Sequence, residues 1–300
     1  MADLVLAIFG PTASGKSDVA GAIADRIPAV LISADAMQVY RDLPILTNQS
    51  PAELVGIWEL DHEASVGEYA GLAHAAVDRA LATGRTPVVV GGTGLYLRAA
   101  LAELDLPPAP EPGTRERWEA EYDRLGPDEA HGLLAERDPA AAARVHPNDR
   151  RRVVRALELA EAGGSLAPRE GLLWSEVTRH PTLVVGLDVA KEVLDERIEA
   201  RTRRMFEAGV EDEVRRALAR PISPTACTVH GLADIAELPR EEALQTLIRR
   251  TKRYAAYQRK WMRRVPGLVS VDADRPAGEV ADEILEMARA RQRLPAGPAG

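Results

Sequence analysis

The stretch "IFGPTASGKSDV", residues 8–19, decides the fold of this chain. A glycine, four residues and then Gly-Lys-Ser match the pattern of a loop that holds phosphate groups. An apolar run at 4–9 precedes the loop, and small and apolar residues recur at helical spacing over 17–27. A strand, a glycine-rich loop and a helix in this order predict an anion-binding site. The expected phosphate-binding residues are Gly10, Pro11, Thr12, Ala13, Ser14, Gly15, Lys16 and Ser17.

The loop alone does not identify its ligand. Lys16 supplies a mobile positive charge and Ser17 can hold Mg²⁺, so a nucleoside triphosphate is the default ligand and a kinase the default enzyme. Enzymes that hydrolyse ATP usually carry an acidic residue at the end of a later strand. The apolar run at 86–94 ends "VVVGGTG", which contains no acid. This departure points away from ATP hydrolysis, and a smaller prenyl diphosphate fits the same cradle.

Three further apolar runs, at 29–35, 86–94 and 181–189, alternate with helical patterns. Strands that alternate with helices predict a parallel sheet covered by helices on both faces. The expected fold class is therefore α/β, a doubly wound parallel sheet like that of P-loop NTPases, interrupted by an inserted helical domain. Open parallel sheets place ligands at the carboxyl ends of their strands, where the phosphate loop lies.

Changes in composition divide the chain into four expected segments. The proline-rich "LPPAPEPGT" begins at Leu106, the following residues are charged, alanine-rich and helical in pattern, and apolar runs then return. Long helices are expected over 192–220 and 240–264. The segments are residues 1–105, the first part of the phosphate-loop core; 106–175, the helical insertion; 176–290, the return to the core; and 291–300, a disordered tail.

Composition excludes several classes of protein. Of the 300 residues 46% are hydrophobic and 28% are charged, which is typical of a globular chain. The single cysteine, Cys227, excludes an internal disulfide framework and indicates a cytoplasmic setting. No signal peptide or membrane span is expected. The net charge is −8, but basic residues cluster at 150–155 and 249–264. Such clusters are either solvated helix faces or binding sites for a polyanion.

Asp35 lies where the chain leaves the second expected strand, facing the phosphate loop in a doubly wound fold. Two interpretations carry equal weight: a general base beside the transferring group, or an aspartate that caps the next turn. Gln38 follows nearby, and its amide can bind an adenine edge through two atoms. The alternative for Gln38 is a solvated helix face.

Four motifs occur in order: "GPTASGKS", "SADAMQVY", "GGTGLYLRAAL" and "HPNDRRRVVRALEL". With them the sequence resembles the tRNA dimethylallyltransferase family from about residue 4 to 264. The resemblance implies transfer of a dimethylallyl group from dimethylallyl diphosphate to N6 of adenosine 37, in tRNAs that read codons beginning with uridine. It also implies that Mg²⁺ assists and that the enzyme acts as a monomer on the anticodon loop, and it implies no protein partner.

The resemblance also implies roles for individual residues. Asp35 matches the catalytic base, and Thr12 matches the threonine that contacts the oxygen bridging diphosphate and prenyl carbon. Lys16, Ser17 and the magnesium ion would neutralise the leaving diphosphate. The residues expected to contact tRNA are Asp35, Ala36, Met37, Gln38, Thr93, Arg115, Arg151, Arg152, Arg155, Gln258, Arg259, Trp261 and Arg263.

Several positions depart from the family pattern. Ala36 stands where the family usually has serine, and "LTNQS", residues 46–50, replaces "GTAKP". In "TACTVHGLAD", residues 225–234, Thr228 replaces Gln or Arg and Leu232 replaces Tyr. His230 is unusual there, and we expect a packing or surface residue rather than a metal ligand.

Three other functions remain open at this point. An adenylate isopentenyltransferase would use a related phosphate loop with a free nucleotide as acceptor. A small P-loop kinase would transfer phosphate to a small acceptor. A tRNA-binding protein that has lost catalysis would keep only the basic segments.

Overall fold

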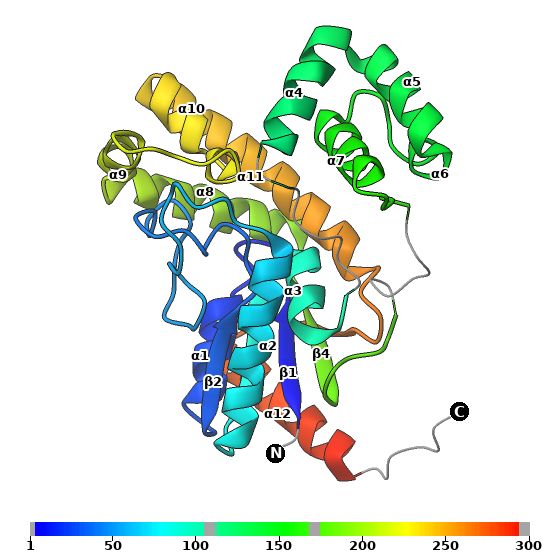
Figure 1. Ribbon diagram of the computed structural model, residues 1–300. Helices are drawn as coiled ribbons and strands as arrows, with labels where there is room; N and C mark the ends of the chain where they lie inside the picture. Colours follow the sequence, from blue (N-terminus) through cyan, green and yellow to red (C-terminus); the bar gives the residue numbers. More distant parts are fainter. Residues whose placement is uncertain (1–3, 105–110, 112, 168–174, 294–300) are drawn as a thin grey trace. The chain divides into compact units, whose positions relative to one another are not determined.

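The computed structural model describes residues 4–104, 111, 113–167 and 175–293 (Figure 1). The chain forms two compact units. The first is discontinuous and comprises Met1–Glu103 and Leu173–Gly300, and the second is the intervening Leu104–Leu172. The proline-rich stretch that we expected as a linker lies largely outside the described residues.

The first unit contains a five-stranded sheet in which every pairing is parallel. Its order is β2-β3-β1-β4-β5, so the first strand of the chain lies at the centre. Leu6 of that strand is in register with Val88 on one side and Leu183 on the other. The strands are β1 (Val5–Phe9), β2 (Ala29–Ser33), β3 (Thr86–Gly91), β4 (Thr182–Asp188) and β5 (Val269–Asp272).

Helices cover both faces of the sheet, which confirms the expected doubly wound α/β fold (Figure 1). Leu6 and Ile8 point to a core shared with α1 (Lys16–Ala24) and α12 (Ala277–Arg293). Because side chains alternate along a strand, Val5, Ala7 and Phe9 point to the opposite face. Helices α2 (Val66–Ala82) and α3 (Gly94–Leu101) pack together against β3 on that side.

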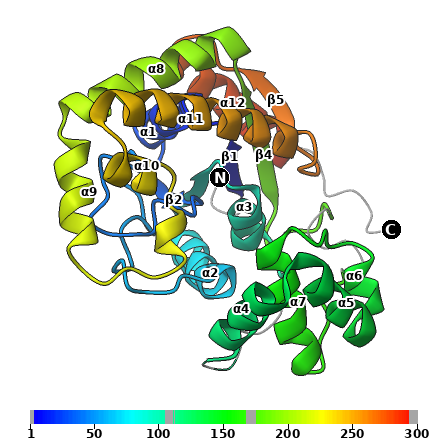
Figure 2. The same cartoon turned by 90° about the horizontal axis from the view of Figure 1, so that it is seen from above.

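Further helices follow the carboxyl end of β4. Helices α8 (Lys191–Glu207) and α11 (Arg240–Met262) run side by side, as Figures 1 and 2 show. Between them come α9 (Val210–Leu218), a 3-10 turn (Ala226–Thr228) and α10 (Leu232–Glu237). The single helix expected over 192–220 is therefore wrong. Gly209, at φ 89°, ends α8 and starts α9 in a left-handed conformation that favours glycine.

The second unit has a core of its own. Its helices are α4 (Thr114–Leu125), α5 (Pro127–Arg137), α6 (Pro139–Ala142) and α7 (Arg150–Glu161). Trp118, Tyr122, Leu134 and Leu157 are buried together there. Asp149 caps α7, since its side chain accepts a hydrogen bond from the backbone N–H of Arg152. The helical pattern read from the sequence thus corresponds to four separate helices.

The carboxyl-terminal end differs from expectation in one respect. Residues 291–293, which we expected in a disordered tail, form the last turn of α12, and the remainder of that tail lies outside the described residues. Within the described part of the chain, no helix combines the length and the apolar character needed to span a bilayer.

Candidate active site

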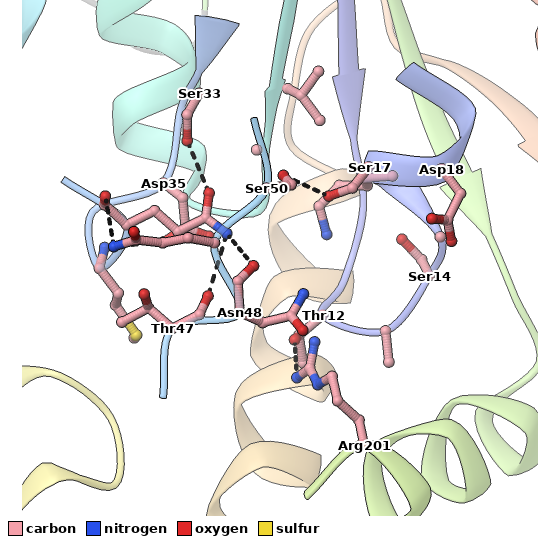
Figure 3. Close-up of a pocket in the computed structure, with 18 of the residues that line it drawn as sticks. Thr12, Ser14, Ser17, Asp18, Ser33, Asp35, Thr47, Asn48, Ser50 and Arg201 are labelled. Atoms are coloured by element: carbon pink, nitrogen blue, oxygen red, sulfur yellow. Dashed lines mark hydrogen bonds between the residues drawn. The ribbon is translucent and has the colours of Figure 1, made fainter. Parts of the chain in front are cut away.

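A cavity of about 960 Å³ opens at the carboxyl ends of the strands, in the first unit (Figure 3). Its walls are the phosphate loop, the segment after β2, the loop at 44–52, and parts of α8 and α11. This is the edge where doubly wound sheets bind ligands, beside the point where the strand order reverses between β1 and β3.

The phosphate loop has the backbone geometry of an anion cradle. Ala13 and Gly15 both have positive φ, at 67° and 86°, and α1 begins at the next residue, Lys16. Alternating conformations of this kind turn successive N–H groups toward one point at the helix N-terminus. The Lys16 ammonium donates to the backbone oxygen of Pro11 at 2.7 Å. Burial lowers the pKa of Lys16 to about 8, and the Arg201 charge adds to that effect while Asp35 opposes it.

Arg201 of α8 lines the same cavity and lies beside Thr12 of the phosphate loop (Figure 3). Its guanidinium donates to the Thr12 hydroxyl at 2.5 Å, so the Thr12 oxygen accepts and its proton stays available for a ligand. The Nε atom of Arg201 is buried without a hydrogen-bond partner, and burial lowers the pKa of the guanidinium. Sequence reasoning missed Arg201, because nothing in "RIEARTRRM" distinguishes it from its neighbouring arginines.

Asp35 lines the same cavity at the end of β2. One carboxylate oxygen accepts from the backbone N–H of Met37 at 2.9 Å, which is the turn-capping use of an aspartate. The carboxylate also acts on the pKa of Lys16, Arg201 and Tyr254, and therefore lies within electrostatic reach of the cradle. The turn-capping interpretation is confirmed, and the residue lines the cavity that holds the phosphate loop, while its role as a general base stays a prediction.

Gln38 does not present a free amide to the cavity. Its oxygen accepts from the Ser33 hydroxyl at 3.0 Å, and its nitrogen donates to the backbone oxygens of Thr47 and Asn48 at 3.2 and 3.0 Å (Figure 3). The oxygen and both amide protons are thus engaged within the protein. The expected contact of this amide with an adenine edge would require these bonds to break, and in this structure Gln38 holds the 46–50 loop.

The burial and the hydrogen bonds of Gln258 differ most from what we expected of the site residues. We expected it to contact tRNA, but the residue is only 2% exposed. Its side-chain oxygen accepts from the backbone N–H of Thr12 at 2.7 Å, and its nitrogen donates to the backbone oxygen of Gly92 at 2.9 Å. A Cβ at Gly92 would lie 2.3 Å from this amide nitrogen, so glycine is required for the close approach. Gln258 therefore ties α11 to the phosphate loop.

Two other residues that we expected to contact tRNA, Trp261 and Arg259, already contact other parts of the protein. Trp261 packs against Gly94, where an added Cβ would lie 2.1 Å from the indole ring. Arg259 is 3.6 Å from Asp188. Arg263 is exposed. The most exposed aromatic ring of this helix is that of Tyr257, which is 54% exposed.

The other expected residues of the first unit surround Asp35. Ala36 donates its backbone N–H to the Thr93 hydroxyl at 3.4 Å, and that hydroxyl lies 3.4 Å from the hydroxyl of Tyr254. Ser17 lies in the first turn of α1, and its hydroxyl accepts from that of Ser50 at 3.2 Å. Among the described residues, no group of three or more His, Cys, Asp or Glu side chains could hold a metal ion.

The arginines expected to contact tRNA in the helical unit fall into two groups. Arg115 and Arg155 bind Glu158, whose side chain is fully buried, at 3.0 and 2.8 Å. Arg151 and Arg152 are exposed at the start of α7. The first pair thus anchors the core of this unit, and the second pair presents charge to solvent.

His230, which we expected to be a packing or surface residue, lines the cavity. Its ring stacks on Tyr254 with centroids 5.8 Å apart, and its Nε2 atom is buried without a partner.

Comparisons with known proteins agree with one another. The family model described as IPP transferase matches residues 38–265, and that described as isopentenyl transferase matches residues 3–56. The chain is 41% identical over 292 residues to a tRNA dimethylallyltransferase of Thermobifida fusca, covering 91% of each chain. It is 40% identical over 307 residues to one of Kineococcus radiotolerans, covering 94% of this chain and 96% of that one.

A solved structure extends the similarity to the fold. The tRNA isopentenylpyrophosphate transferase of Bacillus halodurans matches with a TM-score of 0.66 and 30% identity, covering 98% of this chain and 100% of that one.

Proposed function

The chain belongs to the IPP transferase family, and on that premise we propose that it transfers a dimethylallyl group from dimethylallyl diphosphate to N6 of adenosine 37 in tRNA. One observation carries the proposal: a single cavity holds the phosphate loop and the Asp35 carboxylate, while "VVVGGTG" at the end of β3 has no acid for ATP hydrolysis. The products are N6-(dimethylallyl)adenosine and diphosphate.

The cradle stabilises the leaving group. As the carbon–oxygen bond of the donor breaks, its electron pair leaves with diphosphate. Lys16 and Arg201 face that developing charge, and the Thr12 hydroxyl, held by Arg201, donates a hydrogen bond to the bridging oxygen, which leaves as part of the diphosphate. A desolvated ammonium and a buried guanidinium act on charge more strongly than they would in water.

The adenine side needs orientation and a proton acceptor. The N6 amine is a poor nucleophile because its lone pair is delocalised into the ring. The new carbon–nitrogen bond forms at the allylic carbon, and the N6 proton passes to Asp35. Met37 fixes the carboxylate by its backbone N–H, so the acceptor is oriented before substrate arrives. The base must leave the anticodon stack to reach the cavity.

A magnesium ion fits the donor chemistry of this cradle. Magnesium prefers oxygen ligands and keeps several waters, and the Ser17 hydroxyl together with substrate phosphate oxygens provides such a set. When bound there it would supply further positive charge against the diphosphate.

We further propose that the anticodon loop is the part of tRNA that binds, and that exposed basic and aromatic side chains hold it. Tyr257 and Arg263 on one unit and Arg151 and Arg152 on the other are exposed groups of the kind that stack on bases and pair with phosphates. The proposed enzyme acts as a monomer in the cytoplasm. Its tRNA substrate is found there, and a chain with a single cysteine suits that reducing compartment.

The test uses purified protein, labelled dimethylallyl diphosphate, magnesium and unmodified tRNA with A36-A37-A38. Label should appear on tRNA and not on free AMP. Asp35→Asn should lower the rate by about 100-fold or more, since general-base catalysis contributes 10²–10⁴. Asp42→Asn is the matched control, because it neutralises an acid of the same segment at a left-handed position that asparagine tolerates.

Label on AMP instead of tRNA would move the chain to the nucleotide-acceptor class. If the protein binds tRNA but transfers no label to it, the chain is a tRNA-binding protein that has lost catalysis. Equal losses in the Asp35 and Asp42 variants would refute the assignment of the base.

A further inference from the structure

Three buried side-chain atoms among the described residues have no hydrogen-bond partner: Ser14 Oγ, Arg201 Nε and His230 Nε2. All three belong to residues that line the cavity. A buried polar group without a partner costs about 1–3 kcal/mol, so such groups are rare and each calls for an explanation. Because all three atoms belong to residues of one cavity, we infer that a bound ligand supplies the hydrogen-bond partners that they lack. Ser14 and Arg201 already belong to the phosphate cradle, which leaves His230 to be explained.

Groups on three helices, α8, α10 and α11, act on the His230 ring. Its ring stacks on Tyr254 of α11 with an interplanar angle of 28°. The charges that act on it are Asp234 of α10, Arg250 of α11 and Arg201 of α8. Asp234 and Arg250 pair with each other at 2.9 Å, whereas Arg201 belongs to the cradle. His230 therefore lies within electrostatic reach of the cradle.

The protonation state of His230 suits a hydrogen-bond donor. Burial, Arg250 and Arg201 lower the pKa of the imidazole against the opposing effect of Asp234. The ring is therefore neutral near pH 7 and carries one N–H. A neutral donor adds a hydrogen bond to an anion without adding a third buried cation beside Lys16 and Arg201.

Within residues 209–246, His230 is the one residue that lines this cavity. Its near neighbour Thr228 is exposed and donates its hydroxyl to the backbone oxygen of Thr225 at 2.6 Å. The contribution of this segment to the cavity wall is therefore the imidazole.

We propose that His230 is a diphosphate-binding residue, whose imidazole N–H donates a hydrogen bond to a phosphate oxygen beside Arg201. The assignment rests on the proposed function only in naming diphosphate as the leaving group. It makes the segment between α9 and α10 a direct part of the donor site.

The test compares His230→Met with His230→Gln by calorimetric titration with magnesium and inorganic diphosphate. Both variants remove the aromatic stack and have similar volumes, but only glutamine can donate a hydrogen bond. A hydrogen bond to a charged group is worth about 1.5–3 kcal/mol, so methionine should weaken diphosphate binding about tenfold or more. Glutamine should stay within about threefold of the wild type. Thr228→Ala is the control on the same segment and should bind as the wild type does.

Equal diphosphate affinities of the methionine and glutamine variants would overturn the proposal. So would a methionine variant that binds diphosphate normally while its KM for tRNA rises, since the contact would then be with the acceptor. The titration requires no prenyl transfer. A wild-type protein that binds diphosphate through His230 but transfers no label to tRNA would refute the proposed function and leave this assignment standing.

Discussion

Replacing Gln258 with leucine tests whether this residue supports the phosphate loop or contacts RNA. The buried amide binds the backbone N–H of Thr12 and the backbone oxygen of Gly92. Leucine has a similar size but leaves both backbone groups without a partner. Each buried unsatisfied group costs about 1–3 kcal/mol, so we expect the free energy of unfolding to fall by about 2–6 kcal/mol. Affinity for diphosphate should fall as well, because Thr12 belongs to the cradle.

Urea denaturation followed by circular dichroism measures the change in unfolding free energy, and calorimetry measures diphosphate binding. Tyr257→Leu is the matched control, since it changes the preceding, exposed residue of α11. It should alter stability by less than about 0.5 kcal/mol and weaken only tRNA binding. The reasoning fails if Gln258→Leu has wild-type stability and diphosphate affinity but binds tRNA poorly.

Three further predictions follow from the same geometry. The affinity for magnesium diphosphate should fall above about pH 8 as Lys16, with its pKa near 8, loses its proton; Lys16→Arg should abolish that fall in pH-dependent calorimetry. Glu158→Gln should lower the unfolding free energy of the helical unit by about 3–5 kcal/mol, because it leaves Arg115 and Arg155 without their buried carboxylate. Urea denaturation measures this change, and a decrease of less than about 1 kcal/mol would contradict the prediction. Gly94→Ala should lower the unfolding free energy by about 1–3 kcal/mol through collision with Trp261, and an unchanged melting temperature would argue against that contact.

The central strands could be predicted from the sequence because they are buried on both faces. Val5–Phe9 and Thr182–Asp188 read as continuous apolar runs bounded by polar or glycine residues. Strand β5 offers no such signal, since three of its four residues are exposed at the sheet edge. The phosphate loop was predictable for a different reason: its ligand is held by backbone groups, and the sequence pattern specifies that backbone.

The side chains around the cradle were harder to predict. The burial of Gln258 did leave a signal, because Thr251, Ala255, Gln258 and Met262 recur at the spacing of one helix face. The abundance of basic residues in the same helix drew attention to its exposed side instead. Arg201 left no such signal, since its contact with Thr12 joins positions 189 residues apart. Only the folded chain brings these two together.

The discontinuity of the first unit has a consequence for synthesis on the ribosome. The central strand β1 pairs on one side with β3 and on the other with β4, which follows the whole helical unit in the chain. While the chain emerges, one edge of the most buried strand stays open for the entire time that Leu104–Leu172 is being made. The helical unit is contiguous and has its own core, so it can fold first, and the core that carries the phosphate loop is completed only after β5. In a chain that ends before residue 182, this edge of β1 therefore has no partner strand, which is the arrangement that pairs most readily with other chains.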